Sequence, residues 1–131
     1  MRLLLDTQPW LWMQASPERF SDHALDLVQD PHTDLVFSAA SSWEIAIKYG
    51  LGRLPLPARP AEFVPARIES SGVIPLAVEH AHALLVGELP RHHRDPFDRL
   101  LVAQAQLEDL ALLTADRQFG SYDVEVVWAD A

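Results

Sequence analysis

Five short apolar runs, separated by longer stretches with helical patterning, constrain the fold of this chain more than any other feature. Continuous runs of this kind are typical of strands in a parallel sheet that is buried on both faces. Their alternation with helices indicates an α/β domain in three layers. The runs are Leu3–Leu5, Leu35–Phe37, Val73–Ile74, Ala111–Leu113 and Val124–Val127.

Five stretches between these runs have helical patterns, and the one from Ser38 starts with a capping residue and ends at Gly50. At 131 residues, with no internal repeat or linker, the chain is expected to form a single domain over residues 1–131. We predict a mostly parallel five-stranded sheet between helices. The predicted helices are Ser21–Gln29, Ser38–Gly50, Pro60–Ser71, Val78–Glu88 and Phe97–Glu108.

The composition excludes several kinds of site. The chain has no cysteine, which rules out disulfide scaffolds, thiolate zinc sites, iron–sulfur clusters and cysteine nucleophiles. The longest stretch without a charged residue, Thr7–Pro17, is too short to span a membrane. The apolar start of the chain is too short for a signal peptide. We therefore expect a cytoplasmic protein without a membrane segment.

The formal net charge of −9 argues against an extended basic face for nucleic acid. A nucleic-acid binder of this charge needs bound cations, a local basic patch or a second chain; the charge also fits solubility alone. One dense basic cluster, Arg91-His92-His93-Arg94, precedes Asp95. Contact with substrate phosphate and a solvated loop are both open interpretations of it.

Two acids follow the ends of predicted strands: Asp6 comes directly after Leu5, and Asp116 comes after Leu113 with Thr114 and Ala115 between them. Ligands of open α/β sheets bind at the carboxyl ends of the strands, so both acids are candidates for a site. The alternatives are local: Asp6 would make an Asx-turn, and Asp116 would cap a short helix that runs to Phe119.

Two further acids lie on inward helix faces. Asp98 heads a stripe with Leu101, Val102 and Ala105, and a carboxylate in that position is costly unless it is paired or bound to metal. Asp95 is expected only to cap its helix. Glu44 shares a helix face with Ala40, Ile47 and Leu51, and its alternative role is an ion pair with Lys48.

Four acids on four elements, without cysteine and without a helical His pair at metal spacing, select a hard cation. Mg²⁺ and Mn²⁺ prefer oxygen ligands, and they serve phosphodiester chemistry by activating water and neutralising phosphate. The predicted site therefore consists of Asp6, Glu44, Asp98 and Asp116.

The ordered motifs of the chain resemble the PIN-domain family and, within it, the VapC-type toxins of bacterial toxin–antitoxin pairs. The motifs are Leu4-Leu5-Asp6-Thr7, the segment Ser42–Lys48 with Trp43-Glu44, the segment Asp95–Ala105 that opens Asp-Pro-Phe-Asp-Arg, and Leu112–Asp116.

This resemblance implies a metal-dependent endoribonuclease in which Asp6, Glu44, Asp98 and Asp116 form the acidic site. It implies that a metal-activated water, on Mg²⁺ or Mn²⁺, attacks an RNA phosphodiester in line. It also implies a homodimer and a cognate antitoxin protein. A non-catalytic PIN-like module that binds RNA or protein remains the alternative.

Other interpretations fit less well. A phosphorelay receiver needs an acidic pair after the first strand and a late-strand lysine, and a haloacid-dehalogenase phosphatase needs an acid at position 8, which is Gln8. His80 and His82 are expected on the surface. At least one of Trp10 and Trp12 is expected in the core, and both are candidate anchors for a partner.

Overall fold

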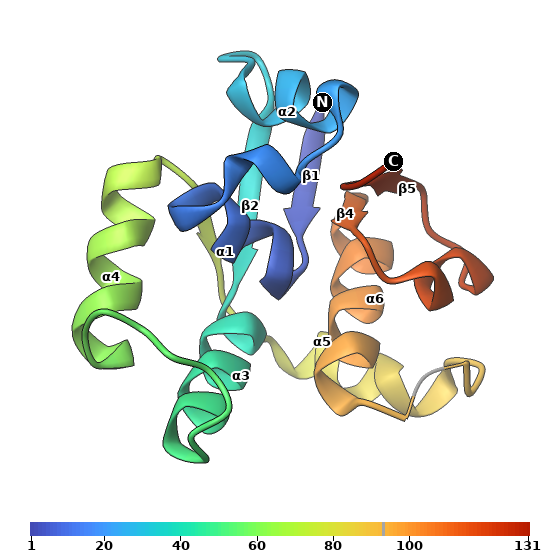
Figure 1. Ribbon diagram of the computed structural model, residues 1–131. Coiled ribbons are helices and arrows are strands. Elements are labelled where there is room, and N and C mark those ends of the chain that lie inside the picture. Colours follow the sequence, from blue (N-terminus) through green and yellow to red (C-terminus); the bar gives the residue numbers. More distant parts are fainter. Residues whose placement is uncertain (93) are drawn as a thin grey trace.

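The computed structural model describes residues 1–92 and 94–131, and a five-stranded sheet lies at its centre (Figure 1). The strand order is β3-β2-β1-β4-β5, and every neighbouring pair is parallel. The predicted α/β fold, with a parallel sheet between helices, is confirmed. The strands are β1 (Arg2–Leu5), β2 (Asp34–Ser38), β3 (Ile74–Leu76), β4 (Ala111–Thr114) and β5 (Val126–Trp128).

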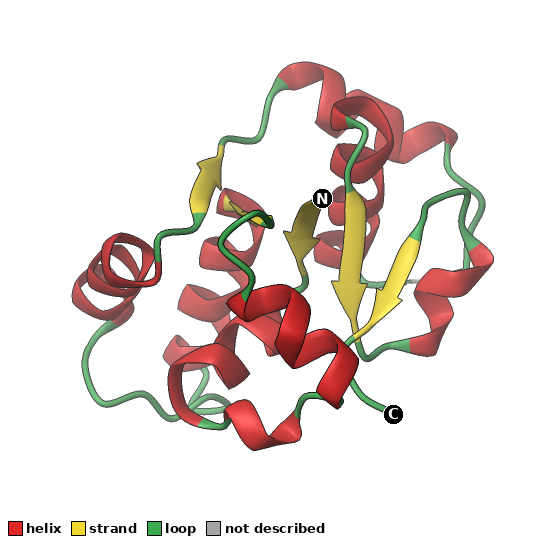
Figure 2. Ribbon diagram, turned by 90° about the horizontal axis from the view of Figure 1, so that it is seen from above, coloured by secondary structure: helices red, strands yellow, loops and turns green. Residues whose placement is uncertain are grey.

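Helices cover both faces of the sheet (Figure 2). Side chains alternate along a strand, so Leu3 and Leu5 of β1 enter one half of the core and Leu4 enters the other. α1 (Thr7–Ala15), α2 (Asp22–Gln29) and α4 (Pro60–Ser71) pack on the first half, and α5 (His80–Leu85) and α6 (Pro96–Glu108) on the second. α3 (Ala39–Gly50) contributes to both halves. Three short 3₁₀ helices span Pro17–Arg19, Val86–Glu88 and Arg117–Ser121.

α1 occupies a segment for which the sequence pattern predicts no helix. The segment is apolar on all sides, so it lacks the periodicity that reveals an amphipathic helix. Both of its tryptophans, Trp10 and Trp12, are buried. Trp10 stacks on Phe37 and meets Phe63 edge to face, and its complete burial excludes it as a surface anchor for a partner. In the part of the chain that the structure describes, no helix is long and apolar enough to cross a bilayer.

The predicted strand and helix ends need small corrections. Val73 is buried, but β3 starts one residue later, at the edge of the sheet, and β5 runs over Val126–Trp128 instead of Val124–Val127. The predicted helix Val78–Glu88 divides into α5 and a 3₁₀ turn.

The expectation of a surface position is confirmed for His80 and wrong for His82, which is 2% exposed. His82 is buried because α5 packs on α6 and both ring nitrogens have partners there. Nδ1 accepts the N–H of Glu79, 2.9 Å away, and Nε2 lies 3.1 Å from Oε1 of Glu108. A histidine with both nitrogens bonded can be buried at little cost.

Candidate functional site

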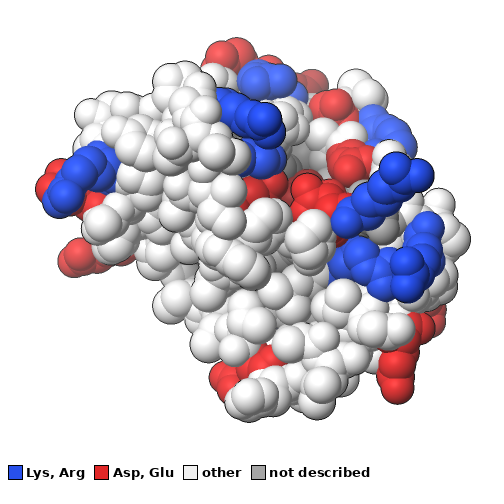
Figure 3. Space-filling view, turned by 90° about the horizontal axis from the view of Figure 1, so that it is seen from below, with Lys and Arg blue, Asp and Glu red and all other residues white. Residues whose placement is uncertain are grey.

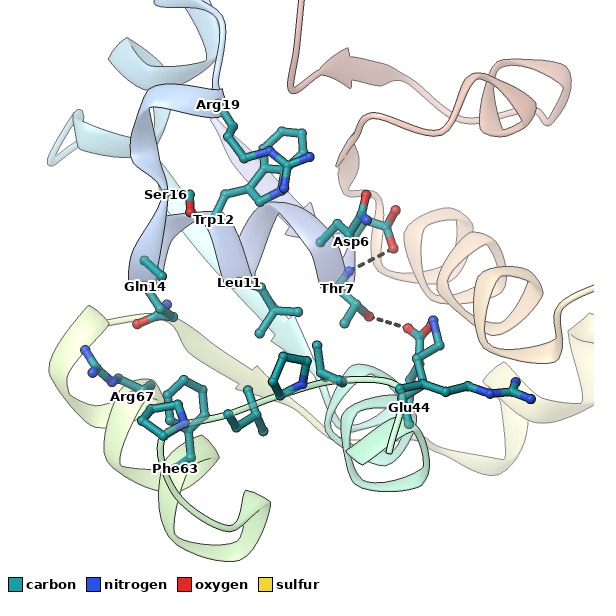
Figure 4. A pocket seen from close by; sticks show the side chains of 18 of the residues that line it. Asp6, Thr7, Leu11, Trp12, Gln14, Ser16, Arg19, Glu44, Phe63 and Arg67 are labelled. Atoms are coloured by element: carbon teal, nitrogen blue, oxygen red, sulfur yellow. Dashed lines mark hydrogen bonds and ion pairs between the residues drawn. The ribbon is translucent and has the colours of Figure 1, made fainter. Parts of the chain in front are cut away.

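The four predicted acids line one pocket of about 690 Å³ at the carboxyl edge of the sheet (Figure 4). Asp6 follows β1, Asp116 follows β4, Glu44 lies on α3 and Asp98 opens α6. β1 and β4 are neighbours in the sheet, so their ends bring the two loop acids together. The fold thus gathers four carboxylates from four elements.

Asp6 is buried and held by two donors. Its Oδ1 accepts the N–H of Thr7 at 2.8 Å, which caps α1, and its Oδ2 accepts the Thr114 hydroxyl at 2.8 Å. The pKa of Asp6 is raised to about 6, chiefly by burial and to a smaller extent by the charges of Glu44 and Asp116, while both hydrogen bonds act in the opposite direction. Asp6 therefore both caps α1 and lines the pocket. The Asx-turn that the sequence left open would use the N–H of Gln8, whereas Oδ1 accepts that of Thr7.

Glu44 is 5% exposed and points from α3 toward α1. Its Oε1 accepts the Thr7 hydroxyl at 2.5 Å, and its Oε2 lies 2.5 Å from Nζ of Lys48. The expected ion pair with Lys48 is thus present inside the pocket. The predicted inward face was partly wrong, because Ile47 and Leu51 are exposed while Ala40 and Glu44 are buried.

Asp98 heads the buried stripe of α6 as predicted: Leu101, Val102 and Ala105 are buried. Burial, followed by the charges of the surrounding acids, raises its pKa to about 8. Asp95 caps α6, because its Oδ1 accepts the N–H groups of Phe97 and Asp98. Asp95 also lines the pocket and so adds to its negative charge.

Asp116 combines the two roles that the sequence left open. It caps the 3₁₀ helix Arg117–Ser121 by accepting the N–H of Gln118 at 3.0 Å, and it lines the pocket. Its own N–H donates to the hydroxyl of Thr114, which in turn donates to Asp6. Thr114 therefore links the two loop acids.

Sequence reasoning missed two residues of the site, Thr7 and Thr114. Both are buried hydroxyls whose protons go to site carboxylates. The available signal was local, because each threonine stands one or two positions from a strand-ending acid. Hydroxyl donors fix a carboxylate's orientation without bringing a competing charge.

The donor set fits a hard divalent cation. All four acids offer oxygen ligands. The pKa values of Asp6 and Asp98 are raised first by burial and then by the charges of neighbouring acids, and a bound cation would offset both effects. Lys48 supplies one positive charge here, and its hydrogen bond to Glu44 raises its pKa. Across residues 1–92 and 94–131, no three metal-binding side chains already stand in ligand geometry. Oxygens of Asp6 and Glu44 are bonded to Thr114, Thr7 and Lys48.

Beyond the acids, the pocket continues as an apolar groove beside α1 and α4. Trp12 and Phe63 line it, with the guanidinium of Arg19 4.7 Å from the Trp12 ring centre and that of Arg67 5.4 Å from the Phe63 ring centre. Asp6 and Glu44 lie at one end and Arg67 at the other (Figure 4). Figure 3 shows acidic side chains in a hollow with Lys and Arg side chains around it. The basic residues of the pocket are Arg19, Lys48, Arg53 and Arg67.

The predicted basic cluster does not line this pocket at its described positions. Arg91, His92 and Arg94 are exposed, and the His92 ring lies 4.9 Å from that of Tyr122. His93 falls outside the described residues. The solvated-loop interpretation agrees with this exposure, and contact with substrate phosphate stays a prediction.

Comparison with known proteins decides the family. The model of the PIN domain matches residues 3–125, nearly the whole chain. The chain belongs to the PIN domain family. Its four acids occupy the carboxyl edge of a PIN domain sheet, where the sequence motifs predicted them.

Individual relatives agree with this assignment. A segment of 56 residues is 52% identical to Ribonuclease VapC16 of Mycobacterium tuberculosis; it makes up 43% of this PIN domain chain and 40% of that protein. A chain of the DNA-bound VapBC2 structure from Rickettsia felis superposes with a TM-score of 0.72 at 16% identity, covering 99% of this chain and 100% of that one. DNA-bound VapBC from Salmonella typhimurium gives 0.66 at 18% identity, covering 98% of both chains. These structural likenesses concern the fold.

Proposed function

We propose that this PIN domain is a metal-dependent endoribonuclease that acts as the toxin of a cytoplasmic toxin–antitoxin pair. One observation carries the proposal: four carboxylates from four elements share one pocket at the ligand-binding edge of the sheet. The local identity to a ribonuclease named VapC16 supports the choice of RNA as substrate.

In this proposal Asp6, Glu44, Asp98 and Asp116 hold Mg²⁺, or alternatively Mn²⁺. The cation would supply positive charge at the phosphate and lower the pKa of a nearby water, which is the chemistry that phosphodiester hydrolysis needs. Thr7 and Thr114 fix the carboxylates by donating their hydroxyl protons. Lys48, half-exposed beside Glu44, stands where it can meet the substrate phosphate.

A protein antitoxin is the second component of the proposal. The groove offers an acidic end, an apolar middle at Trp12 and Phe63, and basic groups at Arg19 and Arg67. This charge order suits a peptide with a basic side chain directed at the acids, apolar side chains over the rings and an acid near the arginines. The structural neighbours include VapBC complexes and a toxin–antitoxin complex from Klebsiella pneumoniae, which supports a partner of this kind.

We also propose a homodimer. α3 and the residue that caps its C-terminal end expose three apolar side chains one helical turn apart, Trp43, Ile47 and Leu51, with exposed fractions of 56%, 39% and 61%. An apolar stripe of this kind is typical of a protein interface. Light scattering of the purified chain would show twice the monomer mass, and Ile47→Glu would return the chain to a monomer.

The test of the activity is cleavage of cellular RNA by the pure protein with Mg²⁺, with Mn²⁺ and with chelator. We expect cleavage with either cation and none in chelator. The matched control is Asp26→Asn, which removes an exposed acid of α2 far from the pocket. Equal cleavage in excess chelator would refute metal dependence, and tight RNA binding without cleavage under any condition would favour the non-catalytic module.

A further inference from the structure

Two helices carry Glu44 and Asp98, and they touch at two points. Ser38, the cap of α3, meets Gln104 in the middle of α6, and Trp43 further along α3 meets Phe97 at the start of α6. The order of these contacts shows that the helices run antiparallel. The two contact points fix how far α6 can slide or turn against α3.

The first contact is a buried polar network centred on Gln104. This side chain is fully buried, and its Oε1 accepts the Ser38 hydroxyl at 2.5 Å. Its Nε2 donates to the carbonyl of Ala77 at 3.2 Å and faces Nδ1 of His82 at 3.4 Å. Since Nδ1 already accepts the Glu79 N–H, His82 carries its proton on Nε2, toward Glu108.

The network is not needed to fill space, because the neighbouring buried positions of α6 are apolar: Leu100, Leu101, Val102, Ala103 and Ala105. A buried amide destabilises the fold unless its hydrogen-bond partners are in place. The amide of Gln104 therefore favours the position of α6 in which it contacts Ser38, Ala77 and His82. A slip of one residue would move α6 by about 1.5 Å and turn it by about 100°. Either change would carry Asp98 away from Glu44.

The second contact acts at the other end of the same helix pair. The rings of Trp43 and Phe97 meet edge to face, with centroids 4.8 Å apart. Each ring stands one position before a site acid, Glu44 or Asp98. Asp98 therefore lies between the two contacts on α6, and Glu44 lies one residue beyond the aromatic contact on α3.

We propose that Gln104 is a positioning residue, which through Ser38 and His82 sets the register of α6 on α3 and so the spacing of Glu44 and Asp98. The inference rests on the proposed metal-dependent function and deepens it. Gln104 touches neither metal nor substrate; it acts by holding the two helices that carry ligands.

The experiment measures Mn²⁺ affinity, from the rise of the unfolding temperature with Mn²⁺ concentration, for Gln104→Met and for Val127→Ala. Methionine keeps the length of the side chain and removes both polar ends. Val127 is buried on β5, which carries no site residue, so its variant is a control for lost stability alone. Ser38→Ala and the double variant with Gln104→Met complete a cycle.

We expect Gln104→Met and Val127→Ala both to unfold at lower temperature, and of these two only Gln104→Met to bind Mn²⁺ at least tenfold more weakly. Ser38→Ala should weaken Mn²⁺ binding as well, and the double variant should be no weaker than Gln104→Met, because the network acts as one unit. A Gln104→Met protein with the same Mn²⁺ affinity as Val127→Ala overturns the inference and leaves the proposed function standing. A wild-type protein that binds no Mn²⁺ overturns both.

Discussion

Replacing Asp98 by Asn should raise the stability of the metal-free protein while it abolishes most of the activity. Asp98 is partly buried among other acids, which raises its pKa to about 8. Asn keeps the size of the side chain and its carbonyl acceptor, and it carries no charge. Without metal, the variant therefore removes the repulsion between the Asp98 carboxylate and its acidic neighbours, and it keeps nearly all of the packing of this side chain.

The sign follows from the raised pKa. Between the ordinary value of 3.8 and about 8, the folded protein holds a proton that the unfolded chain releases. The stability of the wild type therefore falls as the pH rises through this window, by at most about 1.4 kcal/mol per pH unit. The actual effect should be smaller than this upper limit, because Asp98 is partly exposed to solvent and its negative charge is favourable at the start of α6. We therefore expect Asp98→Asn to raise the free energy of unfolding by about 1–2 kcal/mol at neutral pH.

The assay is urea unfolding in chelator at about pH 5 and about pH 8, for the wild type, Asp98→Asn and Asp26→Asn. We expect a gain at the higher pH for Asp98→Asn alone and a smaller gain at the lower pH. With Mg²⁺ at 100 times its Kd, the wild type should gain about 2.7 kcal/mol and the variant clearly less. An Asp98→Asn protein that is less stable than the wild type in chelator would show that Asp98 is a structural cap, and the reasoning would be refuted.

Three further variants test the contacts of the site. Lys48→Met leaves the buried Glu44 carboxylate without its positively charged partner. The free energy of unfolding in urea without metal should fall by about 1–3 kcal/mol, and Mg²⁺ should stabilise the variant more than the wild type. An unchanged response to Mg²⁺ would contradict this prediction. Thr114→Val removes the hydroxyl that donates a hydrogen bond to Asp6. The rate of RNA cleavage should fall by about tenfold or more, because one hydrogen bond to a charged group is lost. Full activity would argue against a role for Thr114. His82→Leu leaves the N–H of Glu79 and the side-chain amide of Gln104 without their acceptor. The free energy of unfolding in urea should fall by about 1–3 kcal/mol. An unchanged free energy would mean that water replaces the ring as the acceptor.

The central strands were predictable because each is an uninterrupted apolar run: Leu3–Leu5 and Ala111–Leu113 are buried on both faces. The meeting of Asp6 and Asp116 was predictable because β1 and β4 run parallel side by side, so both acids follow strands that end at one sheet edge. The spacing of Asp98 from the buried residues Leu101, Val102 and Ala105 was sufficient to predict that it faces inward from α6.

Other features depend on contacts that a single sequence does not reveal. α1 has no polar face, so no pattern marked it as a helix. The burial of His82 depends on α5 packing over Glu108 and Gln104, residues more than twenty positions away. Ile47 shares the period of Glu44 but stays exposed, because α3 extends past the end of the sheet, where no layer covers its outer face.

The anomalous difference map of a crystal soaked in Mn²⁺ tests the central claim most directly. We predict one strong peak in the pocket, with carboxylate oxygens of at least two of Asp6, Glu44, Asp98 and Asp116 as ligands, and with Lys48 displaced from Glu44. A map without a peak in this pocket, with Lys48 still on Glu44 at saturating Mn²⁺, would contradict it.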